Sequence, residues 1–131
     1  MRWGIGAASV IALTTAAFVG LAAAQGGVPV KLGSTSKGQT LVDAKGMTLY
    51  TFDKDSAGKS ACNGPCAHNW PPLAADAGAK PDGAYTIIKR ADGSAQWAYR
   101  NKPLYTWIKD TKPGDVTGDG FLNGAWHVAQ P

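Results

Sequence analysis

The segment LYTFDKD at residues 49–55 decides the fold, because it returns as LYTWIKD at residues 104–110. Downstream of the first copy lies Trp70, and Trp126 lies at the matching place downstream of the second. Self-similarity over such a distance is the signature of a repeated structural unit. The sequence is therefore an internal duplication, with repeat 1 at about residues 39–73 and repeat 2 at about residues 95–129.

Each repeat predicts the same order of elements. A strand leads into a tight turn, the motif forms a second strand, and a loop rich in Gly, Pro and Asp ends at the tryptophan. A further strand is expected at residues 85–90, and an edge strand at residues 28–32, where Pro29 is acceptable. The first strands are expected at residues 40–43 and 96–100, and the turns at Lys45-Gly46 and Asn101-Lys102.

Composition agrees with a small β protein. The 131 residues include 17 Gly, 8 Pro and 5 Trp, no Glu, and 44% hydrophobic residues, which disfavours long helices but allows one packed core. Alternation along a strand places Tyr50 with Phe52, and Tyr105 with Trp107, on one face, where core packing is the simplest role. We therefore expect an all-β fold, a small antiparallel sandwich or curled sheet of two pseudo-symmetric repeats joined by Gly/Pro/Asp-rich loops.

The first 24 residues predict an export signal. Arg2 is followed by an uncharged, mostly apolar run, and three alanines precede Gln25. Cleavage after Ala24 would leave residues 25–131 as a single β domain, not an integral membrane protein, in the periplasm or secreted. Because no cysteine ends the signal region, no lipid anchor is expected. The basic residues are scattered singly, which argues against a nucleic-acid partner.

The motif resembles that of a known family. Tyr-x-[Phe/Trp]-x-x-Asp occurs twice, and a Cys-x-x-x-Cys segment with Trp70-Pro71-Pro72 follows the first copy. Together these resemble the bacterial "secreted repeat of unknown function" family, putative lipoproteins with a Yx(F/W/Y)xxD motif, over about residues 39–129. The resemblance implies an exported envelope protein without an established activity. The motif residues are Tyr50, Phe52 and Asp55 in repeat 1, and Tyr105, Trp107 and Asp110 in repeat 2.

The two cysteines of the chain, Cys62 and Cys66, allow two interpretations. In an exported protein the pair predicts a disulfide, a local staple made possible by the turn at Gly64-Pro65. If the cysteines were reduced, two thiolates with the imidazole of His68 would suit Cu(I). The disulfide is the favoured interpretation, and copper is its alternative.

A second candidate metal site lies where repeat 2 lacks the cysteines. Asp115, Thr117 and Asp119 fall at the first, third and fifth positions of a calcium loop, but Trp126 stands where a bidentate Glu is required. A true EF-hand is excluded. A network of Asx turns is the simpler interpretation, and a weak Ca²⁺ site is the alternative.

No catalytic motif is recognisable, so we expect a non-catalytic exported module of undefined binding role, monomeric, with an unidentified envelope partner and no obligatory cofactor. One alternative is a periplasmic redox or copper-binding accessory protein that uses Cys62, Cys66 and His68. Another is a glycan-binding module, which requires several of the following tryptophans to be exposed together: Trp70, Trp97, Trp107 and Trp126.

Overall fold

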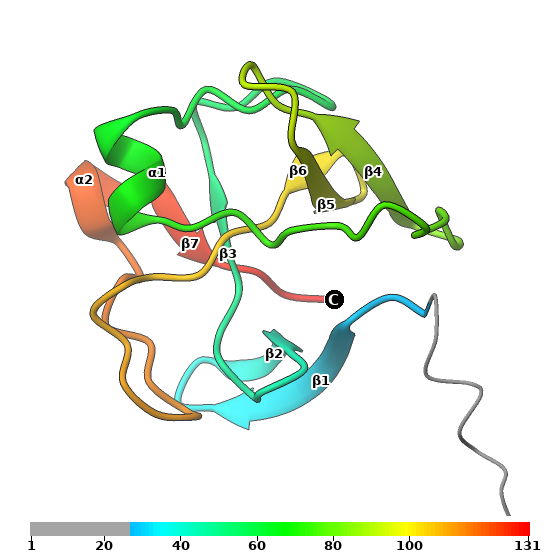
Figure 1. The fold of residues 1–131 in the computed structure, drawn as a ribbon. Helices are drawn as coiled ribbons and strands as arrows, with labels where there is room; N and C mark the ends of the chain where they lie inside the picture. Colours follow the sequence, from blue (N-terminus) through cyan, green and yellow to red (C-terminus); the bar gives the residue numbers. More distant parts are fainter. Residues whose placement is uncertain (1–26) are drawn as a thin grey trace, which may run out of the picture.

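The computed structural model describes residues 27–131, and the predicted export signal lies outside these residues. The described chain contains seven short strands and two short helices (Figure 1). The fold is all-β, as the composition predicts. The strands are β1 (Val30–Thr35), β2 (Gly38–Asp43), β3 (Tyr50–Phe52), β4 (Tyr85–Lys89), β5 (Ala95–Tyr99), β6 (Lys102–Pro103) and β7 (Trp126–Val128), and the helices are α1 (Pro65–Asn69) and α2 (Phe121–Gly124).

The strands form three small antiparallel sheets. β1 pairs with β2, β3 pairs with β7, and β4, β5 and β6 form the third sheet in that order. Figure 1 shows the β3–β7 pair between the β1–β2 hairpin and the β4–β5–β6 sheet. Since β7 comes from the end of the chain and β3 from repeat 1, the centre of the molecule is built from both repeats.

A pseudo-twofold relationship links the two repeats at the tyrosines of the motif. The amide of Tyr50 donates to the carbonyl of Tyr105 at 2.7 Å, and the amide of Tyr105 donates to the carbonyl of Tyr50 at 3.0 Å. The neighbours repeat the pattern, because Leu49 donates to the Leu41 carbonyl and Leu104 donates to the Trp97 carbonyl, both at 3.0 Å. The duplication seen in the sequence is thus also a duplication of backbone hydrogen bonds.

The second copy of the motif differs from the predicted strand. In repeat 1 the motif forms β3 and pairs with β7. In repeat 2, Tyr105 is the only residue of the motif that forms a β-bridge. The segment that lies beside Tyr105 is Pro71-Pro72. It corresponds to His127-Val128 of β7, the segment that lies beside Tyr50. Proline has no N–H to donate, so Pro71 accepts a bond from the Thr106 amide (2.9 Å) but cannot return one. The bonds on either side, from the Ile108 amide to the Asn69 carbonyl and from the Leu73 amide to the Leu104 carbonyl, both 2.9 Å, are kept.

Two buried clusters replace the single expected core. Tyr50 and Tyr105 lie in an aromatic cluster, while the preceding residues, Leu49 and Leu104, lie in an aliphatic cluster around Trp97. Successive residues of an extended chain point to opposite faces, so the central segments carry one cluster on each side. All five of these side chains are at most 1% exposed.

Two predicted boundaries are corrected by the structure. The edge strand β1 begins after Pro29, and not at residue 28, because the register with β2 starts at Val30 opposite Asp43. The turn between β5 and β6 is Arg100-Asn101 rather than Asn101-Lys102, since Lys102 already pairs with Tyr99. Both turn residues have positive φ, 50° and 69°, as in the two-residue turns that fit the twist of a hairpin.

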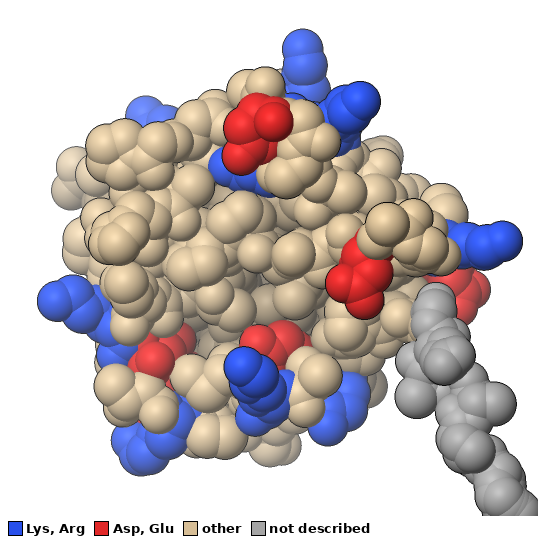
Figure 2. All heavy atoms as spheres, in the orientation of Figure 1, with Lys and Arg blue, Asp and Glu red and all other residues tan. Residues whose placement is uncertain are grey.

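Charged side chains lie mainly around the margin of the face shown in Figure 2, and the surface over α1 and α2 is largely uncharged. Among residues 27–131, no helix is long and apolar enough to cross a membrane.

Candidate functional site

The two motif copies exchange their tyrosine–aspartate hydrogen bonds. Tyr50 of repeat 1 donates to Asp110 of repeat 2, and Tyr105 of repeat 2 donates to Asp55 of repeat 1, each at 2.7 Å between oxygens. Burial raises the pKa of both tyrosines, so both hydroxyls keep their protons at neutral pH. The motif therefore holds one repeat to the other.

The second oxygen of each motif aspartate binds the loop of its own repeat. Oδ1 of Asp110 accepts the amide (3.0 Å) and the hydroxyl (2.6 Å) of Thr117. Oδ1 of Asp55 accepts the amide of Ala61 at 2.7 Å. Every motif carboxylate oxygen thus has an internal donor, and these residues act in the architecture of the fold.

The motif aromatics stack in one column across the pseudo-twofold axis. Phe52 stacks on Trp126 at 4.1 Å, Trp126 on Trp70 at 3.8 Å, and Trp70 on Trp107 at 4.0 Å between ring centroids. The order reads the same from either end, since Phe52 corresponds to Trp107 and Trp126 to Trp70. No ring of the column is more than 8% exposed.

The glycan-binding alternative is not supported, because the tryptophans on which it depends are buried. That alternative requires several exposed tryptophans, but Trp70, Trp107 and Trp126 stack in the column and Trp97 is 1% exposed in the other cluster. Within residues 27–131, no tryptophan is more than 8% exposed, so none presents an open face to a sugar.

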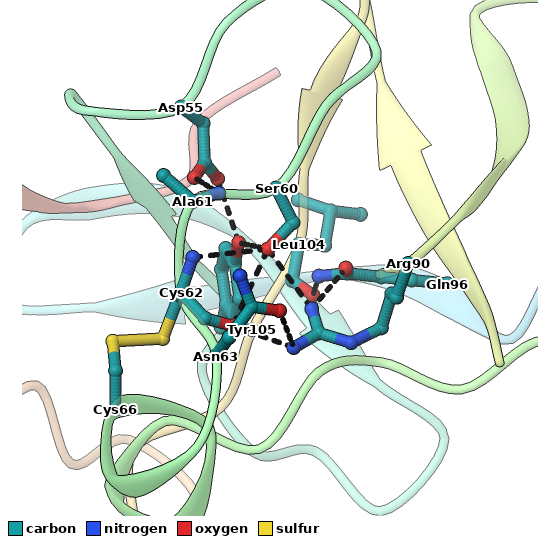
Figure 3. Close-up of a disulfide and its surroundings, with 10 residues drawn as sticks. All are labelled: Asp55, Ser60, Ala61, Cys62, Asn63, Cys66, Arg90, Gln96, Leu104 and Tyr105. Carbon is teal, nitrogen blue, oxygen red and sulfur yellow. Dashed lines mark hydrogen bonds between the residues drawn. A yellow bond between two sulfur atoms is a disulfide. The ribbon is translucent and has the colours of Figure 1, made fainter. Parts of the chain in front are cut away.

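Cys62 and Cys66 form a disulfide, with sulfurs 2.07 Å apart (Figure 3). Cys62 is fully buried in the aromatic cluster, and Cys66 packs against the same cluster. His68 lies exposed on α1. With the sulfurs bonded to each other, the two thiolates required by the copper alternative are absent from this state of the chain.

A buried arginine beside the disulfide was not foreseen from the sequence. Arg90 is 6% exposed, and its guanidinium donates to the Cys62 carbonyl, to Ser60 Oγ and to the side-chain oxygen of Gln96 (Figure 3). Ser60 in turn contacts the hydroxyl of Tyr105 at 2.7 Å. Arg90 thus ties the disulfide loop to the cross-repeat hydrogen bond; its position at the end of a strand gave no signal of this role.

The three candidate calcium ligands point to different protein partners. Asp115 accepts from the Thr111 amide (2.8 Å) and from Lys112 Nζ (2.8 Å). Thr117 donates to Asp110, while Asp119 accepts the Val128 amide at 3.0 Å and pairs with Lys37 at 3.2 Å. Across residues 27–131, no group of three or more His, Cys, Asp or Glu side chains is placed to hold a metal ion.

A groove runs beside β3 and is lined by residues of both repeats. It consists of two hollows, of about 250 and 400 Å³, which share Thr51, Asp53, Arg100 and Lys102. The first hollow extends toward the loop at Asp55–Ala57, and the second extends along the end of the chain from His127 to Gln130. We call this surface the β3 groove.

The β3 groove gathers charged side chains from three parts of the chain. Asp53 follows β3, His127 lies on β7, Arg100 lies in the β5–β6 turn, and Lys102 begins β6. Nε2 of His127 lies 2.7 Å from Oδ2 of Asp53. Sequence reasoning missed this group, because its members are scattered along the chain and only the pairing of β3 with β7 and the hairpin turn bring them together.

Across the pseudo-twofold, Asp53 and His127 have apolar counterparts, whereas Arg100 corresponds to Lys45. The pseudo-twofold relates Asp53 to Ile108, and it relates His127 to Pro71. The loop of repeat 2 also packs on the corresponding turn, since a Cβ at Gly46 would lie 3.4 Å from the side chain of Pro113. The charged groove is therefore a feature of one side of a duplicated fold.

Comparison with known proteins identifies the family of this chain. The fold is that of an all-β repeat protein, and the family described as "secreted repeat of unknown function" matches the chain twice, at residues 31–74 and 86–130. These matches cover more than half of the chain, so the protein belongs to this family. No curated protein and no solved structure matches the chain.

Proposed function

We propose that the protein is a non-catalytic binding module of the bacterial envelope and that the β3 groove is its binding surface. Membership of a family of secreted repeats supports the exported location. The groove supports the binding role, because it brings Asp53, Arg100, Lys102 and His127 to one hollow surface. The motif carboxylates, by contrast, have internal donors at every oxygen.

Because the motif residues hold the two repeats together, we do not assign them a catalytic role. A general acid or base must be able to exchange a proton with a substrate, but Tyr50 and Asp110 are buried against each other. The exposed pair of His127 and Asp53 is the nearest resemblance to an acid–base pair, and the lining of the groove also carries the hydroxyls of Thr51 and Ser56. We assign this pair to ligand contact.

Native mass spectrometry of protein taken directly from the periplasm or medium tests the binding role. We expect a fraction of the molecules to carry a small ligand that is lost on denaturation. Ala57→Trp, which fills the first hollow, should abolish that mass increment, while Ala91→Trp, at an exposed turn outside the groove, should keep it. A ligand retained equally by both variants, or none on the wild-type protein, contradicts the proposal.

The same spectra test export. We expect a mature chain that begins at Gln25, in the periplasm or medium, with neither the first 24 residues nor an acyl chain. A mass that includes a lipid would overturn the prediction that no anchor is present.

A further inference from the structure

In the β3 groove, the acidic side chains have partners within the protein, but the basic side chains do not form ion pairs within residues 27–131. Asp53 pairs with His127, and both oxygens of Asp55 accept hydrogen bonds, from Tyr105 and from the Ala61 amide. Neither Arg100 nor Lys102 forms an ion pair within residues 27–131, and both are exposed. The cations are therefore the charges that a ligand can still neutralise.

Arg100 also occupies a backbone conformation that does not suit it. Its φ is 50°, in the left-handed region where Asn, Asp and Gly are favoured and an ordinary residue costs about 1 kcal/mol. The guanidinium carbon lies 5.0 Å from the centroid of the Tyr99 ring. This contact orients the guanidinium but uses none of its N–H donors, and no hydrogen bond of that side chain within residues 27–131 explains its presence in the turn.

Neutral donors complete the same surface. Thr51 lines both hollows, and Ser56 lines the first. An arginine fork, an ammonium group and hydroxyls are the donors that bind phosphate and carboxylate oxygens in proteins.

We propose that the β3 groove binds a small ligand through an oxyanion group, phosphate or carboxylate, and that Arg100 and Lys102 hold this group. The inference rests on the proposed binding role of the groove. It gives Arg100 a reason to occupy its strained turn position, because asparagine would fit the turn better and only contact with a ligand requires arginine there.

Amide NMR titrations of the full mature chain at constant ionic strength test the inference with four probes: inorganic phosphate, acetate, glucose and methylammonium. We expect phosphate or acetate to shift the amides of Thr51, Lys102 and Val128 in a saturable manner, and the stronger of the two identifies the oxyanion. Glucose and methylammonium should leave these amides unchanged.

Two variants separate a ligand role of Arg100 from a role in the turn. Arg100→Asn should weaken anion binding at least about tenfold while the free energy of unfolding stays the same or rises, because asparagine suits the conformation. Lys45→Asn removes a positive charge from the turn before the first motif, outside the groove, and should bind as the wild type does. Unchanged binding by Arg100→Asn, or a loss of stability in that variant, overturns the role of Arg100.

The remaining outcomes distinguish this inference from the proposed function. Binding of glucose or methylammonium at the groove without binding of either anion overturns the oxyanion inference but leaves the groove a binding surface. If no probe shifts the groove amides and native protein carries no ligand, both proposals fall.

Discussion

Tyr50 donates its hydroxyl hydrogen to Asp110, 60 residues further along the chain, and so joins the first motif to the second. The aspartate oxygen that receives this bond, Oδ2, has no other donor within residues 27–131. Tyr105 and Asp55 form the matching bond, but Asp55 is more accessible to water than the 8%-exposed Asp110.

Tyr50→Phe should therefore destabilise the protein by about 2 kcal/mol, the cost of leaving a buried carboxylate oxygen without its donor. Tyr105→Phe should cost less, because water can reach Asp55. Urea unfolding followed by tryptophan fluorescence measures both. Tyr85→Phe, outside the motif, is the control, and an equal or larger loss in that variant would remove the special role of the cross-repeat bond.

Gly118 tests the packing of the aromatic column. A Cβ at this position would lie 2.6 Å from Cη2 of Trp70 and 3.0 Å from Cγ of Trp107. Gly118→Ala should thus cost about 2–3 kcal/mol and reduce the near-ultraviolet circular dichroism of the stacked indoles. The matched control is Gly78→Ala, since a Cβ at Gly78 meets nothing within 4 Å. Similar stability of the two variants would show that the stacked rings can shift to accommodate the added methyl group.

Removing the disulfide should have a moderate effect. The double variant Cys62→Ala/Cys66→Ala should lose about 2 kcal/mol, as expected for so short a loop, and should remain folded. Repeat 2 supports this expectation, because it closes the equivalent loop with Gly118 and Leu122 in place of cysteines. Failure of the double variant to fold would show that the bond is essential.

Thiol titration of native protein separates the disulfide from the copper alternative. We expect no reactive thiols before reduction, and no change in stability from His68→Ala. Two free thiols that disappear on adding Cu(I) and return with a chelator would establish the metal site, in which case His68→Ala should weaken copper binding.

Asp115 should make stability depend on acidity. The hydrogen bond from Lys112, followed by that from the Thr111 amide, lowers the pKa of Asp115 to about 2. Since the unfolded carboxyl titrates near pH 4, its contribution is complete above about pH 4 and is lost as the pH falls to about 2. Asp115→Asn should lower the melting temperature at pH 6, with a gap that closes across this window. An equal gap for the exposed Asp76→Asn would contradict the assignment.

The sequence predicted the duplication, the all-β class and the disulfide because each leaves a local or periodic trace. LYTFDKD and LYTWIKD align by eye, and a cysteine pair in an exported chain has few other uses. The exchange of partners between Tyr50 and Asp110 leaves no such trace, since an aligned repeat shows which residues correspond but not which ones touch.

The β3 groove was missed for a similar reason. Asp53, Arg100 and His127 are far apart in the chain, and only the pairing of β3 with β7 beside the β5–β6 turn brings them to one surface. The loss of the second motif strand was in principle visible, because Pro71-Pro72 removes two N–H donors, but its effect depends on knowing that this segment lies beside Tyr105.

The exchanged tyrosine–aspartate bonds have a consequence for the ancestry of the fold. A chain with a single motif would carry a tyrosine and an aspartate that could each be satisfied only by another molecule, and half of the aromatic column would lack its other half. Two such chains could complete each other through a self-complementary interface around a true twofold axis. Gene duplication and fusion would place both halves of that homodimer in one chain, as they are here. Once joined, the halves were free to diverge, and the groove built from both of them carries Asp53 and His127 where its counterpart across the pseudo-twofold has Ile108 and Pro71.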